Sequence, residues 1–175
     1  MKTLTLVALL SAAAAGLSAT SVAWAQDHSG PQAPAQPPRD VSQFNIQKGK
    51  PAINGYDPVA YFPVGGGKPA KGSKQFVAEH RGVTYWFASA ANRDVFLKDP
   101  DAYEPEYGGW CATAMAAGDK VEIDPRNFKI TGSRLFLFYK GLLGNALNDW
   151  NKDEPKLTGE ADAAWSKLSG EKTAG

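Results

Sequence analysis

Cys111 and Met115 are the residues whose types and spacing point most directly to chemistry. They are the single cysteine of the chain and its single methionine other than Met1. If segment 110–117 is a helix, as we expect, a separation of four residues places both on one face. Thiolate and thioether are soft donors that favour Cu(I). The pattern therefore suggests a soft metal site such as one for copper, with packing in the core as the alternative, because two ligands do not close a site.

A third donor would have to come from another part of the chain, and His80 is the one histidine within the expected domain. Its alternative role is that of an ordinary turn residue, because it ends a predicted strand. Cys111 also follows Gly108-Gly109 at the start of the predicted helix, where a thiolate is favoured, and His80 could serve as its base. The chain has neither a second cysteine nor an evident orienting residue for such a nucleophile. We therefore expect no catalytic site and predict that the protein is not an enzyme.

Residues 1–25 have the form of a cleavable signal peptide. Lys2 precedes an apolar run over residues 4–15, and Ala23-Trp24-Ala25 matches the small-residue pattern that signal peptidase cleaves. The apolar run is interrupted by small polar residues, which disfavours the alternative of a retained membrane anchor. The sequence therefore predicts a periplasmic or secreted protein without a stable membrane anchor, cut after Ala25.

Cleavage after Ala25 would create a second candidate metal ligand, His28. The new terminus would read Gln26-Asp27-His28. Its free amine, two backbone amides and the imidazole can form a square-planar nitrogen site, a geometry that suits Cu(II) or Ni(II). Cyclisation of Gln26, or a shifted cleavage point, would remove this site.

Aromatic residues give a third candidate, a flat pocket for a small molecule or a partner protein. Tyr56, Tyr61 and Trp110 would supply its apolar walls, with Asp57 as a polar group. The alternative is that these residues belong to the core and its rim, as most aromatic side chains do. The sequence leaves the ligand of such an interaction module open.

Composition limits the remaining possibilities. The chain has 175 residues, 19 basic and 18 acidic, so removal of residues 1–25 leaves 150 residues with 18 of each sign. A neutral chain has no electrostatic reason to bind nucleic acid. About 150 residues suffice for one domain, which a single cysteine cannot staple internally.

The pattern of residues predicts a small α+β domain with an antiparallel sheet over residues 41–170, preceded by a Pro-rich flexible linker over 26–40. Residues 74–80 and 83–88 read as a hairpin, and Ser89 as the N-cap of a helix that stops at Asp99-Pro100. No internal repeat is evident. The further elements expected are helices over 110–117, 144–150 and 159–168, and strands over 121–123, 128–131 and 135–139.

Three stretches together resemble the YHS-domain family, in its exported branch. They are YDPVAYF (56–62), the long segment from Tyr85 to Ala112, and GSRLFLFY (132–139). The middle stretch is the specific one, with an aromatic strand, a Ser-capped helix, an Asp-Pro stop and a tyrosine at fixed spacing. The resemblance covers about residues 44–168.

This resemblance implies heavy-metal binding, often linked to copper, through cysteines of the first motif and of the strand and helix that follow. Here Ala60 stands near the first expected thiol, and the strand and helix have Ala88, Ser89, Ala91 and Asn92 but no cysteine. The resemblance therefore supports the fold more than the metal site. We expect an extracytoplasmic, non-catalytic YHS-type domain that binds or handles a soft metal, with the interaction module as the alternative.

Overall fold

The computed structural model describes residues 39–142 and 144–173, which belong to one compact unit, Pro37–Gly175. The expected signal peptide, the first part of the linker and His28 lie outside the described residues. Arg39 and Asp40, the last residues of the expected linker, lie at the edge of the domain, and the Asp40 side chain caps the first 3₁₀ turn, η1 (Val41–Gln43).

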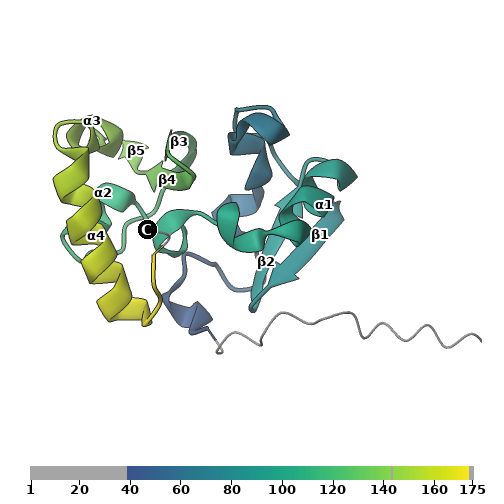
Figure 1. Ribbon diagram of the computed structural model, residues 1–175, viewed down its shortest axis with the longest axis horizontal. Coiled ribbons are helices and arrows are strands. Elements are labelled where there is room, and N and C mark those ends of the chain that lie inside the picture. The colour runs from purple at the N-terminus through teal and green to yellow at the C-terminus, as the bar shows by residue number, and fades with distance from the viewer. Residues whose placement is uncertain (1–38, 143, 174–175) are drawn as a thin grey trace, which may run out of the picture. The chain divides into compact units, whose positions relative to one another are not determined.

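The first half of the domain is a hairpin covered by a helix (Figure 1). Strands β1 (Ser73–His80) and β2 (Val83–Phe87) pair antiparallel around Arg81-Gly82. Helix α1 (Ala90–Lys98) begins where the Ser89 hydroxyl accepts the amide of Asn92. A hairpin alone is marginal in water, so its stability depends on this helix, whose buried Phe96 contacts the rings of Tyr85 and Phe87. Three further 3₁₀ turns lie between η1 and the hairpin: η2 (Ala52–Gly55), η3 (Val59–Tyr61) and η4 (Pro63–Gly65).

The second half contains another hairpin, β3 (Asp124–Thr131) with β4 (Arg134–Phe138). Before it come η5 (Pro100–Ala102), η6 (Glu106–Gly109) and the short helix α2 (Ala112–Ala116). After it come the small pair β5 (Lys140–Gly141) and β6 (Gly144–Asn145), and then α3 (Ala146–Trp150). Trp150 is fully buried and packs on the rings of Phe136 and Phe138.

Helix α4 (Glu154–Ser169) lies along α2 at the C-terminal end of the described chain (Figure 1). Its Trp165 packs edge-on against Phe44 and lies so close to Gly108 that a Cβ there would come within 2.7 Å of the indole. Gly108 also has φ +59°, so glycine meets both requirements at this position. Arg134 of β4 bonds to Asp162 of α4 and to Glu106, which fixes the helix to the sheet.

The α+β class, the first hairpin and the Ser89-capped helix are confirmed. Within the described residues, however, the strands form three separate two-stranded sheets rather than one sheet. The predicted strand over 121–123 is wrong: Val121 instead accepts the amide of Cys111 in a loop. The last helix begins at Glu154 rather than near Gly159, because Asp153 caps it there. No helix in the part of the chain described is long and apolar enough to cross a membrane.

Candidate functional site

Cys111 and Met115 both lie in the core, at the start and near the end of α2. Their side chains are 1% and 0% exposed. Cys111 occupies the N-cap of the short helix, and its carbonyl accepts the amide of Met115. Nucleophilic chemistry at this thiol requires access that the folded domain does not give.

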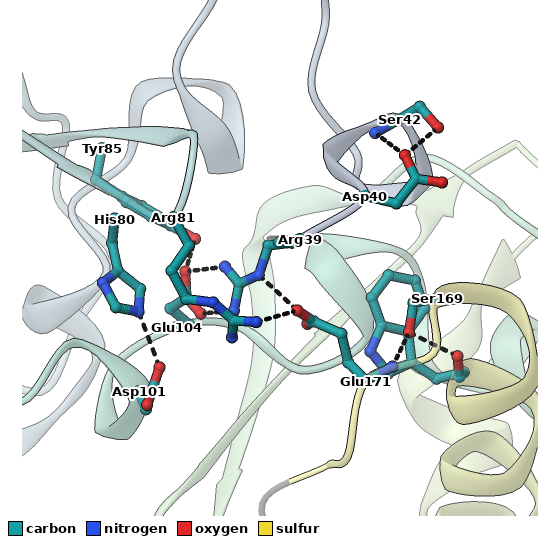
Figure 2. Close-up of polar contacts among 11 residues, drawn as sticks. Arg39, Asp40, Ser42, His80, Arg81, Tyr85, Asp101, Glu104, Ser169 and Glu171 are labelled. Atoms are coloured by element: carbon teal, nitrogen blue, oxygen red, sulfur yellow. Dashed lines mark hydrogen bonds and ion pairs between the residues drawn. The ribbon is translucent and has the colours of Figure 1, made fainter. Parts of the chain in front are cut away.

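Among the potential metal ligands, the structure brings His80 together with Asp101 and Glu104. His80 ends β1, next to the turn of the first hairpin, and its Nε2 lies 2.9 Å from Asp101 Oδ1. Glu104 completes a group in which the three ligand atoms all lie within 4.8 Å of one another. Figure 2 shows His80 and Asp101 beside the polar network that contains Glu104. Imidazole nitrogen and carboxylate oxygen suit divalent ions such as Zn²⁺ and not Cu(I).

Glu104 has hydrogen-bond partners of its own. Arg39 donates to both of its oxygens at 2.8 and 2.7 Å, and the Tyr85 hydroxyl donates at 2.7 Å. Burial and the charge of Glu104 raise the pKa of Tyr85 well above its usual range, so this hydroxyl remains a donor. Any cation at Glu104 would have to share the carboxylate with these donors.

The network around Glu104 continues to the C-terminal segment. Arg39 donates to Glu171 at 2.7 Å, and Arg81 reaches the same carboxylate at 3.1 Å. Burial alone would lower the pKa of Arg39, but its bonds to the two glutamates raise it overall. Asp101 lies beside this network through its contact with His80.

Asp57, predicted to line a ligand pocket, is completely buried and bonded within the fold. One carboxylate oxygen accepts the amides of Val59 and Ala60, and the other accepts the amide of Ala88 and the Asn92 side chain. These contacts join η3, the end of β2 and α1. Every donor comes from the chain itself, which indicates a structural role.

The other three residues of the predicted aromatic pocket have separate environments. Tyr61 is 2% exposed, and its hydroxyl donates to the carbonyl of Pro125; burial raises its pKa. Tyr56 is half-buried beneath the ammonium of Lys71, and Trp110 donates to the carbonyl of Gln43. The structure shows no common pocket for these residues among the hollows it describes.

An open hollow of about 560 Å³ lies elsewhere, at α3. It is lined by Val121, Tyr139, Gly144, Asn145, Ala146, Asn148, Asp149 and Lys152. None of the candidate site residues predicted from the sequence lines this hollow. Its polar and apolar lining does not select one class of ligand.

The sequence pattern did not predict three residues of this site, which are Asp101, Glu104 and Arg39. They lie 21, 24 and 41 residues from His80, in η5, just after it and in the expected linker, where spacing carries no signal. The acidic residues around Asp99-Pro100 hinted only at a helix stop. Tertiary packing alone brings these residues together.

Comparison with protein-family models, curated proteins and solved structures found no match for this chain.

Proposed function

We propose that the chain is an extracytoplasmic, non-catalytic domain of YHS type that binds a divalent metal ion through His80, Asp101 and Glu104. The convergence of these three donors, one from the end of β1 and two from segment 101–104, is the observation that carries the proposal. The types of the donors support it as well, because one imidazole nitrogen and two carboxylate oxygens suit a divalent ion such as Zn²⁺.

A site for a soft metal such as Cu(I) fits the residues of this chain less well than a site for a divalent ion. The positions where YHS relatives would have thiols hold Ala60, Ala88, Ser89 and Ala91. Cys111 and Met115 are packed in the core. The donor set at His80 instead suits Zn²⁺ or Cu²⁺, bound less tightly than in a dedicated site because Arg39 competes for Glu104.

Titration of the mature protein with ZnCl₂ by calorimetry tests this proposal. The protein would carry His28→Ala, so that the terminal site cannot contribute. We expect one zinc ion per chain, with affinity reduced about tenfold or more by His80→Ala and by Asp101→Ala. Asp149→Ala removes a carboxylate that is similarly exposed, 60% against 54% for Asp101, and should leave binding unchanged.

Zinc binding that is the same in wild type and in His80→Ala would overturn the proposed site. If a Cys111→Ser, Met115→Leu variant alone lost metal binding, the soft site would be the correct one. If no variant bound metal and wild type did not either, the interaction module would remain as the function to test.

A further inference from the structure

We infer that the domain contains two copies of one motif, residues 51–101 and 105–155, and that Asp57 and Cys111 occupy equivalent positions before the second helical turn of the two copies. Each copy has a 3₁₀ turn, a second helical turn, a hairpin and a helix, in that order. The packing partners correspond as well: α1 packs on β1 and η3, and α3 packs on β3 and α2. The inference does not depend on the proposed metal site.

The 3₁₀ turns that open the copies share an unusual backbone. Each follows a proline, Pro51 or Pro105, and each contains three successive left-handed residues. In η2 the φ angles are 53°, 52° and 79° for Ile53, Asn54 and Gly55. In η6 they are 56°, 59° and 83° for the three residues that begin with Tyr107. Left-handed residues that are not glycine are rare, so two such runs with one pattern are strong evidence of a shared motif.

The two hairpins have the same register. In the first, Ser73 pairs with Phe87, the register shifts, and pairing resumes from Val77 to the turn. In the second, Asp124 pairs with Phe138, and pairing resumes from Phe128 after the same interval. Every partner in the second hairpin is 51 residues after its counterpart in the first. A bulge at the same place in both hairpins is a specific feature, because bulges are positioned by the fold that needs them.

The helix that follows each hairpin packs in the same way. Phe96 lies 5.0 and 5.1 Å from the rings of Tyr85 and Phe87, and Trp150 lies 5.1 and 5.5 Å from those of Phe136 and Phe138. A Lys-Asp pair stands at the corresponding place in each copy, Lys98-Asp99 at the end of α1 and Lys152-Asp153 just after α3. The backbone angles agree closely there, with φ −156° and ψ 76° at Asp99, and φ −157° and ψ 65° at Asp153.

Asp57 and Cys111 correspond within this scheme. Each follows the aromatic C-cap of the 3₁₀ turn, Tyr56 or Trp110, and each donates its amide to a carbonyl three residues before the hairpin, that of Ala70 or Val121. The Asp57 carboxylate accepts the amides of Val59 and Ala60 from one residue before Pro58, the N-cap of η3, whereas Cys111 is the N-cap of α2 and its side chain accepts no amide there. In the second copy, Cys111 therefore has the backbone position of a cap but no side-chain oxygen that could accept the amides of α2.

An asparagine at Cys111 tests the equivalence without burying a charge. Its side-chain oxygen should accept the amides of Thr113 and Ala114, as Asp57 does with Val59 and Ala60. We expect Cys111→Asn to melt about 2–4 °C above Cys111→Ala, the shift that one restored cap gives in a domain of this size. Amide hydrogen exchange of Thr113 and Ala114 should also be slower in Cys111→Asn.

Met115→Asn is the matched control, because Met115 is buried in the same helix as Cys111. Its counterpart in the first copy is Tyr61, which does not cap the helical turn. Met115→Asn should melt well below Met115→Ala. If Cys111→Asn melts at or below Cys111→Ala and exchange at Thr113 and Ala114 is unchanged, position 111 is not a cap and the inference is overturned. A crystal structure of Cys111→Asn in which the amide oxygen points away from both amides would overturn it too.

Discussion

Single buried residues determine how the elements of the first copy meet, and Asp57 is the main example. Its carboxylate accepts four hydrogen bonds from three elements and is fully buried. In Asp57→Asn, the side-chain NH₂ would replace one carboxylate oxygen and face N–H groups that now donate to that oxygen. These N–H groups would lose their acceptor. We expect the free energy of unfolding to fall by about 3 kcal/mol. Urea denaturation measures this loss, with Asp149→Asn as the exposed control; a loss similar to that of the control would contradict the structural role.

The Cys111 thiol should be protected in the folded protein, because it is only 1% exposed. We expect a thiol reagent at neutral pH to react slowly with the native chain and rapidly in urea. The ratio of the two labelling rates is the measurement. Rapid labelling of the native protein would restore the reactive-thiol hypothesis.

Helix α1 depends on its cap at the scale of the element. Ser89→Ala removes the side-chain acceptor for the Asn92 amide and should lower the free energy of unfolding by about 1 kcal/mol. Ser166→Ala is the matched control, since Ser166 is an exposed residue within α4 where alanine is favoured. Chemical denaturation of both variants should show a loss for position 89 only; an equal response would mean that the cap does not stabilise α1.

Helix α4 is joined to β3 by Glu154, which accepts bonds from Lys129 and Thr131. Burial alone would raise the pKa of Glu154. These hydrogen bonds lower it by more than burial raises it, so the pKa in the folded state lies below the usual 4.5. A depressed carboxylate pKa stabilises the fold above about pH 4.5, and this stabilisation is lost as the pH falls through the folded value. Glu154→Gln should therefore be less stable than wild type at pH 7, and the difference should narrow towards pH 3. A difference that is constant from pH 7 to pH 3 would contradict this contribution.

The fold of the first half could largely be predicted from the sequence, whereas the candidate site could not. Alternation and turn residues revealed the hairpin over 73–87, and Ser89 marked the helix start, because both signals are local. The duplication was hidden because the copies share backbone geometry and packing more than residues: Ile53 matches Tyr107, and Phe96 matches Trp150. The His80 cluster was hidden because its members meet only through tertiary packing.

At the scale of the whole molecule, Arg39 joins the two ends of the domain. It links the start of the described chain to Glu104 on the central loop and to Glu171 beyond α4, with its side chain 4% exposed (Figure 2). Arg39→Met would leave two largely buried carboxylates without their main partner. We expect the free energy of unfolding to fall by about 3 kcal/mol, measured by urea denaturation.

Arg126→Met is the control for Arg39, since Arg126 is 73% exposed and forms an ion pair with a single aspartate. It should have little effect on stability. Equal effects of the two substitutions would show that Arg39 does not hold the ends together.

Anomalous diffraction at the zinc edge, from crystals of the mature protein soaked with ZnCl₂, tests the central claim most directly. The account predicts one peak between His80 Nε2, Asp101 and Glu104, about 2.0–2.2 Å from the ligand atoms. A peak at another site in the domain, or none while His80 keeps its bond to Asp101, would contradict it.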